Sequence, residues 1–297
     1  MQITFLGTGA AEAYPGLFCT CMNCEKAREL GGKNLRCRSS AVVNDDLFID
    51  FGPDASAQAT RFNVNLAGIS DFLFTHSHWD HLAVHDMFFR SSGYRRNGNL
   101  DIATLWGNEE SIDAVLDQLR VKLAKEFTVP GDIIPTREET RDELVDYLRL
   151  NVRVMEPRNT REIGRYTVHA LDAMHKEPEK TMNFIIDDGT AVFLYATDTG
   201  PWGDDTWSFL DALDLQLDVV ALDCTVGHGI PGGHHSYDSF LAEREGLREC
   251  GVLKEDTIFL AHHFSHQDGL VHNEVVDFME HRGIKVTHDG LVIIRNS

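Results

Sequence analysis

The sequence predicts a layered α/β protein with sheets at its core and helices outside. Short apolar segments with strand character recur along the whole chain, mixed with segments of helical periodicity. Turn signals at Asn44-Asp45-Asp46 and Asp188-Gly189 separate apolar runs and predict hairpins, and Asp289-Gly290 predicts a similar turn before the last strand. The 297 residues contain no Pro/Gly/Ser-rich linker and no clear repeat, so we expect one domain spanning residues 1–297.

The predicted strands extend along the whole chain, and the helices with the clearest periodicity begin at Glu109. The strands are predicted at Gln2–Leu6, Ser40–Val43, Leu47–Asp50, Phe72–Thr75, Thr104–Trp106, Tyr166–Leu171, Asn183–Ile186, Ala191–Ala196, Asp218–Asp223, Thr257–Ala261 and Leu291–Arg295. The helices are predicted at Glu109–Phe127, Arg137–Leu150, Asp205–Leu213, Tyr237–Cys250 and Asn273–Arg282. We expect the mostly helical, charged region near 109–165 to be an insertion, which could cover a site.

The charge balance disfavours two classes of partner. Lys and Arg number 27 against 47 Asp and Glu, which gives a formal net charge of −20. Such a surface repels nucleic acid and anionic membranes unless a local basic patch overrides it.

No run of 18 apolar residues is present, and the start, MQITFLGTGAAEAYPG, lacks the basic region of a signal peptide. We therefore expect a cytoplasmic protein with reduced cysteines.

The sharpest local signal is Thr75-His76-Ser77-His78-Trp79-Asp80-His81, which follows an apolar strand. Histidine is the commonest metal ligand and binds as a neutral donor near pH 7. On a loop after a strand, His76 and His78 can point to one metal ion, and Asp80 with His81 to a second. A chance cluster of surface histidines is the alternative, but so dense a cluster at a strand end disfavours it.

A second cluster consists of Cys19, Cys21 and Cys24, whereas Cys37, Cys224 and Cys250 are scattered. The tight spacing of the first three predicts a metal site rather than three reduced buried thiols. The scattered three are better explained as small buried hydrophobic residues.

The pattern His-x-His-x-Asp-His after a strand resembles the metallo-β-lactamase superfamily. The resemblance implies a four-layer αββα sandwich with a dinuclear hydrolase site. Further ligands are implied where Ala173-Met174-His175, Tyr195-Ala196-Thr197-Asp198 and His263 follow predicted strands. The implied set is His76, His78 and His175 on one ion, Asp80, His81 and His263 on the other, and Asp198 bridging both. The neighbouring alternatives are His169 for His175, Asp223 for Asp198 and His262 for His263.

A narrower resemblance is carried by Leu6-Gly7-Thr8-Gly9, Cys-x-Cys-x-x-Cys, Arg38-Ser39-Ser40 and His263-Phe264-Ser265-His266. These motifs are similar to the branch that contains a phosphoribosyl cyclic phosphodiesterase. The branch also includes a relative from pyrroloquinoline quinone biosynthesis with a degraded histidine motif. The intact motif in this chain favours a hydrolase. The resemblance implies a structural zinc held by Cys19, Cys21, Cys24 and His266, a standard closed Cys₃His set.

The expected function is hydrolysis of a small cyclic phosphate or nucleotide-like ester by a hydroxide that bridges two divalent ions, Zn or Mn. Asp80 and His235 are the expected catalytic residues, with His235 preferred by resemblance over His234 as the proton donor. The alternatives are hydrolysis of a carboxylic ester, lactone or thioester, or a non-catalytic metal-containing accessory role in cofactor biosynthesis. We expect a small-molecule phosphoester as partner, no nucleic acid and no membrane, and leave a homodimer open.

Overall fold

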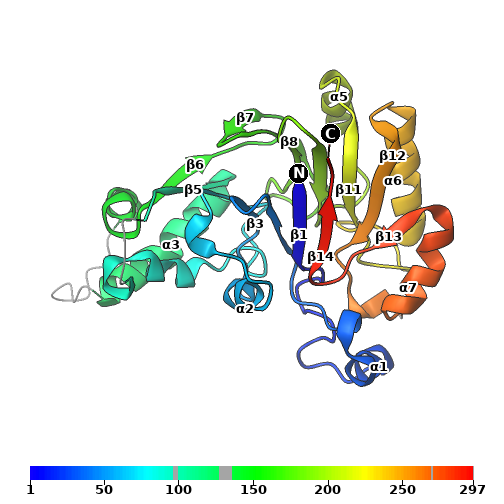
Figure 1. Cartoon of the computed structure of the whole chain (residues 1–297), viewed down its shortest axis with the longest axis horizontal. Coiled ribbons are helices and arrows are strands. Elements are labelled where there is room, and N and C mark those ends of the chain that lie inside the picture. Colours follow the sequence, from blue (N-terminus) through cyan, green and yellow to red (C-terminus); the bar gives the residue numbers. More distant parts are fainter. Residues whose placement is uncertain (96–99, 127–135, 269, 297) are drawn as a thin grey trace.

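Two seven-stranded sheets lie face to face in the computed structural model, which describes residues 1–95, 100–126, 136–268 and 270–296 (Figure 1). In spatial order, the first sheet contains β14 (Leu291–Ile294), β1 (Gln2–Gly7), β2 (Ser40–Val43), β3 (Leu47–Ile49), β4 (Asp71–Leu73), β5 (Ala103–Gly107) and β6 (Leu150–Val154). The second contains β13 (Ile284–Val286), β12 (Leu253–His262), β11 (Leu217–Asp223), β10 (Val192–Ala196), β9 (Met182–Asp187), β8 (Tyr166–Asp172) and β7 (Thr160–Ile163).

Each sheet has an antiparallel half and a parallel half. From β14 to β3 the neighbours are antiparallel, and from β3 to β6 they are parallel. In the second sheet the parallel half runs from β10 to β13. Parallel strands present their carboxyl ends at one edge, so the loops that follow β10, β11 and β12 converge there.

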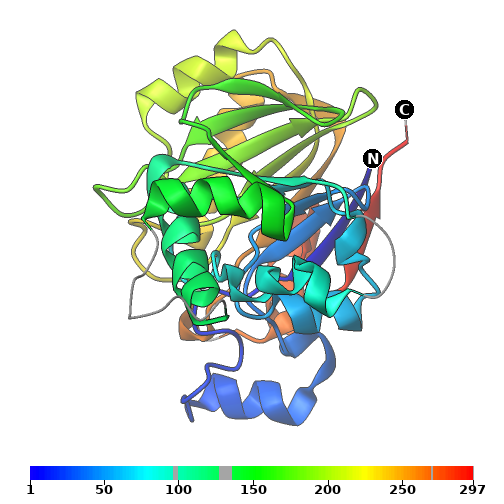
Figure 2. The same ribbon diagram turned by 90° about the vertical axis from the view of Figure 1, so that its left-hand side faces the viewer.

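Helices cover both outer faces of the pair of sheets (Figures 1 and 2). On the first sheet lie α2 (Ala55–Arg61) and α3 (Glu109–Glu126), and α4 (Arg137–Glu143) packs against α3. On the second lie α5 (Asp204–Ala212), α6 (Tyr237–Glu249) and α7 (His272–Met279). The short α1 (Met22–Leu30) lies at the bottom of both views, where its Ala27 packs with Val271. Short helical turns are η1 (Gly32–Asn34), η2 (Leu66–Gly68), η3 (Val84–Arg90), η4 (Ser92–Tyr94), η5 (Leu144–Leu148), η6 (His266–Asp268) and η7 (Glu280–Arg282).

The core between the sheets explains why the strands form where they do. Phe5, Leu47, Tyr166, Phe193 and Leu260 belong to one buried cluster that both sheets share. Separate clusters lie between each sheet and its own helices. Strands that are buried on both faces need nearly continuous apolar sequence, as in LDVVALD of β11. The predicted layered α/β fold is confirmed as a four-layer αββα sandwich.

The predicted hairpins are confirmed by their turns. Val43 pairs with Leu47 across the turn, and Asn44 and Asp45 have φ values of 51° and 68°. Asn and Asp tolerate this left-handed conformation, which the short three-residue connection between the paired strands uses at two of its positions. At the second hairpin, β9 and β10 pair around Gly189, whose φ is 78°.

In the described part of the region 109–165 the last helical residue is Leu148, so the helical part of this segment is shorter than expected. Its last part forms β6 and β7, which close one edge of each sheet. The predicted end of the first helix at Phe127 lies outside the described residues. Among the described residues, those that line the pocket at the candidate metal centre come from other parts of the chain than this region. Whether the region is an insertion stays a prediction.

None of the helices within the described ranges combines the length and the apolar character that crossing a membrane requires.

Candidate metal centre

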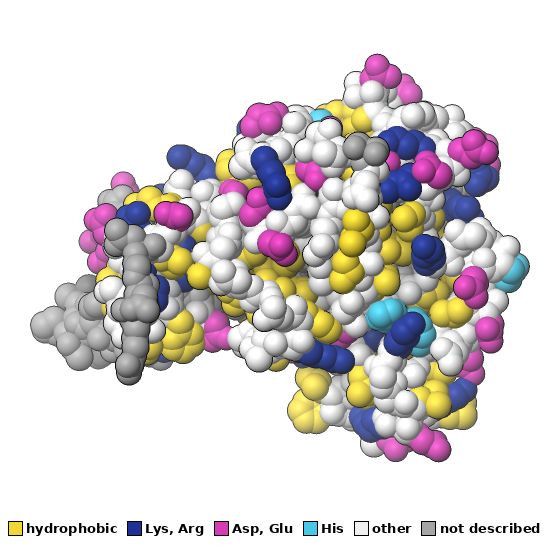
Figure 3. Space-filling view, in the orientation of Figure 1, with side chains coloured by type: hydrophobic (Ala, Val, Ile, Leu, Met, Phe, Trp, Pro, Cys, Tyr) yellow, Lys and Arg dark blue, Asp and Glu magenta, His cyan; other side chains and the backbone are white. Residues whose placement is uncertain are grey.

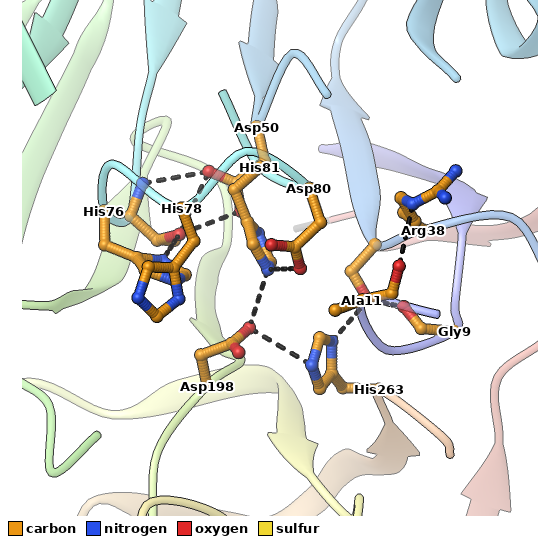
Figure 4. A network of polar contacts seen from close by, with 12 residues as sticks. Gly9, Ala11, Arg38, Asp50, His76, His78, Asp80, His81, Asp198 and His263 are labelled. Atoms are coloured by element: carbon orange, nitrogen blue, oxygen red, sulfur yellow. Dashed lines mark hydrogen bonds and ion pairs between the residues drawn. The ribbon is translucent and has the colours of Figure 1, made fainter. Parts of the chain in front are cut away.

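Loops at the ends of several strands bring the candidate ligands together, and Figure 4 shows His76, His78, Asp80, His81, Asp198 and His263 converging. The loop after β4 carries His76 to His81, and the loops after β8, β10 and β12 carry His175, Asp198 and His263. Asp223, at the end of β11, lies beside His234 from the loop before α6. The first sheet therefore supplies the contiguous motif, and the second sheet supplies the separate ligands.

Asp198 lies between the two predicted ligand sets. Its Oδ2 is 3.0 Å from Nε2 of His81 and 3.2 Å from Nε2 of His263. Its Oδ1 is 3.7 Å from Nε2 of His175. Asp80 joins the same group, with its Oδ2 3.0 Å from Nε2 of His81. A carboxylate with one oxygen toward each set is placed as a bridging ligand would be.

The second group consists of His76, His78 and His175. Their ring nitrogens lie within 4.8 Å of one another, and Nε2 of His175 is 3.3 Å from Nδ1 of His78. Nε2 of His76 is buried and has no hydrogen-bond partner among the described residues. A buried nitrogen without a partner costs free energy unless something satisfies it. A cation at the centre of the group would satisfy it, so the residues fit a metal ion.

Charge and burial give His76 and Asp198 the protonation states that metal ligands need, whereas at His81 the neighbouring carboxylates outweigh burial and raise the pKa. Burial and the neighbouring His81 lower the pKa of His76 well below its usual value, which keeps this ring neutral. Burial acts to raise the pKa of Asp198, but His263 and His81 outweigh it and hold that pKa well below the ordinary range. A neutral imidazole and an ionised carboxylate are the donor forms that bind divalent cations.

The ring nitrogens that face away from the centre are held by oxygen atoms. The contacts are His76 Nδ1 with Thr75 Oγ1 at 3.0 Å, His81 Nδ1 with Asp50 Oδ2 at 2.9 Å, His175 Nδ1 with Gly233 O at 3.0 Å, and His263 Nδ1 with Ser39 Oγ at 2.7 Å. Such contacts orient metal-binding histidines.

Asp50, to which the sequence analysis gave no role, contacts the candidate ligand His81. It is fully buried, contacts His81 and accepts hydrogen bonds from the backbone N and Oγ1 of Thr75. A carboxylate directly after the buried strand β3 was the available signal.

The structure separates the chosen ligands from their neighbours in sequence. His262 points away from the centre, with Nδ1 3.0 Å from Oγ1 of Thr287 and its ring against Phe5 and Tyr195. His169 contacts Thr160 on the adjacent strand β7. His175 and His263 are the members of these pairs that lie in the cluster.

The expected proton donor His235 is absent from the residues that line the pocket, whereas the alternative, His234, is among them, so the geometry favours His234. The ring of His235 is buried, its Nδ1 contacts Oγ of Ser239, and burial lowers its pKa to about 4. Nδ1 of His234 lies 2.9 Å from Oδ2 of Asp223. Burial acts to lower the pKa of His234, but the Asp223 carboxylate outweighs it and raises this pKa to about 9.

The cysteine cluster forms a separate group. The sulfur atoms of Cys19, Cys21 and Cys24 lie within 4.8 Å of one another and of a ring nitrogen of His266. Nδ1 of His266 is 3.7 Å from Sγ of Cys19 and 3.6 Å from Sγ of Cys21. Hydrogen bonding from the Cys24 backbone lowers the pKa of Cys21 to about 6, which favours a thiolate there, whereas burial raises the pKa of Cys24 to about 12. The predicted four residues therefore meet in a set suited to zinc.

The candidate ligands open into a pocket of about 610 Å³. His78, Asp80, His175, Asp198, His234 and His263 form part of its wall. Glu12, Lys176 and Ile230 line other parts of it. The volume is in the range of small-molecule sites.

The comparisons assign the class of protein. Residues 46–235 match the family model described as the Beta-lactamase superfamily domain. The chain therefore belongs to the beta-lactamase superfamily, and its two sheets with outer helices have the metallo-β-lactamase fold. A comparison with curated proteins finds no match to the sequence.

Solved structures of the same fold extend over nearly the whole chain. A diphosphatase of the PhnP family is 22% identical, with a TM-score of 0.66 over 99% of this chain and 97% of that one. Zn²⁺-bound PqqB from Methylobacterium extorquens is 17% identical, with a TM-score of 0.66 over 99% and 100%. The short form of human tRNase Z is 15% identical, with a TM-score of 0.60 over 100% of both. At these identities the likeness shows the fold.

Proposed function

We propose that the protein is a dinuclear metal-dependent hydrolase that acts on a small cyclic phosphate or nucleotide-like phosphodiester. The observation that carries the proposal is the position of Asp198. Its two carboxylate oxygens face two groups of histidines, and one of these groups contains a buried nitrogen without a hydrogen-bond partner in the described ranges.

In this proposal His76, His78 and His175 hold one ion, Asp80, His81 and His263 hold the other, and Asp198 contacts both. When bound, two divalent cations supply positive charge for phosphate oxygens and lower the pKa of a water molecule. The ligands allow Zn or Mn.

Two carboxylate–histidine pairs at the centre orient one ring and keep another protonated in this proposal. Asp50 contacts Nδ1 of His81, so the other nitrogen of this ring faces Asp80 and Asp198. Asp223 contacts Nδ1 of His234 and favours its charged form, which makes His234 the proposed donor of a proton to the leaving oxygen. Asp80 lines the pocket and contacts His81, and we retain the catalytic role proposed for it.

The pocket also explains how an acidic chain could take an anionic substrate. The formal net charge is −20, so attraction must be local. The ions would supply it, and Lys176 adds a cation at the pocket wall. We therefore propose a small-molecule phosphoester as partner rather than a nucleic acid. The diphosphatase among the similar folds supports placing phosphate esters ahead of carboxylic esters.

A substrate panel tests this proposal. The purified chain, reconstituted with Zn²⁺ or Mn²⁺, would be assayed with bis-p-nitrophenyl phosphate, a lactone and a thioester. We expect metal-dependent hydrolysis of the phosphodiester, with kcat/KM at least about tenfold above the other two. Preference for the lactone or thioester would assign the chain to carboxylic ester chemistry. Hydrolysis of none of the three would favour the accessory role.

A further inference from the structure

The loop between β8 and β9, residues 173–181, connects the two halves of the metal centre. It carries His175, and the backbone N of Gly200 donates to O of Met174 near its start. Near its other end, Oε1 of Glu179 accepts a hydrogen bond of 2.5 Å from the backbone N of Ser77, within the histidine motif of the first sheet. The same loop thus holds one candidate ligand and contacts the segment that holds others.

His78 is the candidate histidine whose orientation is least supported by burial. Its side chain is 34% exposed, whereas those of His81, His175 and His263 are 9% exposed or less. The rings of His76, His81, His175 and His263 each have an oxygen within 3.0 Å of the nitrogen that faces away from the centre. Nδ1 of His78 faces His175, and its Nε2 lies 4.0 Å from Oε2 of Glu179.

The surroundings of Glu179 restrict both its side chain and its backbone. Its side chain is 14% exposed, and its two oxygens face different groups, Oε1 the backbone of Ser77 and Oε2 the ring of His78. Its backbone is fixed as well, because its N donates to O of Lys176 and its O accepts from N of Thr181. The backbone of Glu179 is therefore fixed within the loop 173–181, while its carboxylate faces the loop that carries Ser77 and His78.

We propose that Glu179 is a positioning residue that fixes the ring of His78 and sets its spacing from His175 for one of the two ions. Nε2 of His78 faces the Glu179 carboxylate, and Nδ1 faces His175 and is the nitrogen placed to bind metal. The contact to Ser77 fixes the backbone on which His78 stands. The inference rests on the proposed function only in assuming that divalent ions occupy the centre.

The test compares Glu179→Ala and Glu179→Gln with Glu177→Ala, a matched control on the same loop. Metal-free proteins would be titrated with Zn²⁺ and with Mn²⁺ in competition with a chromophoric chelator, without substrate. We expect Glu179→Ala to weaken one active-site ion by about 10- to 100-fold, as loss of such orienting contacts does. Glu179→Gln should recover part of the affinity, because its amide oxygen can still accept from Ser77. Glu177→Ala should bind like the wild type.

Circular dichroism and the melting temperature of the metal-free variants would separate positioning from folding. An unchanged fold with one weakened ion supports the proposal. Affinities of Glu179→Ala within twofold of the wild type for both ions would overturn it, as would an equal loss in Glu177→Ala. If Glu179→Ala does not fold, the affinity of Glu179→Gln decides, and a value equal to the wild type counts against the proposal.

The outcome is distinguishable from failure of the proposed function. A wild type that binds two active-site ions but cleaves no phosphodiester would contradict the proposed substrate and leave the Glu179 comparison intact. Wild-type binding and phosphodiesterase activity with unaffected Glu179 variants would contradict the inference alone. A wild type that binds no active-site ion would overturn both.

Discussion

The pKa values of single side chains at the centre depend mainly on their charged neighbours. Asp198 is buried, yet its pKa is held low because His263 and His81 lie against it. Asp223 has the same relation to His234, whose pKa rises to about 9 against the effect of burial. At both positions a neighbouring group of opposite charge outweighs burial.

The role proposed for His234 predicts how activity depends on the leaving group. His234→Ala should lower kcat about 10²- to 10⁴-fold with a poor leaving group such as an alkoxide. The loss should be much smaller with p-nitrophenolate, which leaves without a proton. Steady-state kinetics on both substrates, with metal content measured in parallel, test this.

His235 provides the control for that experiment. Its ring contacts Ser239 and lies outside the pocket wall, so His235→Ala should change the two substrates by equal factors. A larger leaving-group dependence for His235→Ala than for His234→Ala would restore the sequence-based choice.

The sequence could not separate these two histidines. Consecutive residues in a loop often point in opposite directions, and no periodic pattern indicates which one faces the pocket. The contact between Ser77 and Glu179 was hidden for another reason, since it joins residues 102 positions apart. The contiguous motif from His76 to His81 was predictable because its ligands share one loop.

At the scale of elements, the segment after β12 connects the two metal groups. His263 directly follows β12 with a φ of 61° and faces Asp198, while His266, three residues later, faces the cysteine sulfurs. Zinc bound to the cysteine cluster would fix this segment from one side. The N-terminal loop before α1 would be tied to the C-terminal part of the chain by the same ion.

Removing one cysteine should therefore affect both groups. Cys21→Ser should lose one tightly bound zinc and lower the melting temperature, because a structural zinc contributes directly to folding. It should also reduce activity by displacing His263. Metal analysis and thermal unfolding of the purified variant measure these effects.

Cys250→Ser is the matched control, since this cysteine lies away from the cluster and contacts Asp211. It should keep the wild-type metal content. Free titration of Cys19, Cys21 and Cys24 by a thiol reagent in native, metal-replete protein would contradict the zinc assignment.

The elements that the sequence missed share weak hydrophobic patterns. β6 and β7 are edge strands with exposed positions, and β7 reads TREI, with one buried residue. In α1, Cys24 and Ala27 are the buried residues, and the exposed remainder gives no strong apolar face. Central strands were placed within a few residues because burial on both sides requires continuous apolar sequence.

At the scale of the whole molecule, the centre exists only where the two sheets meet. The first sheet supplies the motif from His76 to His81, and the second supplies His175, Asp198 and His263. Metal binding should therefore stabilise the packing of one half against the other.

On the face shown in Figure 3, acidic and basic side chains are interspersed, so the net charge of −20 does not form one continuous acidic patch on that face.

The most direct test of the central claim is the number of metal ions per chain in the wild type and in Asp198→Ala. Native mass spectrometry and elemental analysis would be applied to protein reconstituted with Zn²⁺ and then freed of unbound ions. The wild type should retain about three ions, two at the centre and one at the cysteine cluster. Asp198→Ala should retain about one, because both active-site ions lose a shared ligand. An Asp198→Ala variant that keeps the full wild-type complement and near-normal kcat would contradict the bridging role, and Asp223 would then be the carboxylate to test.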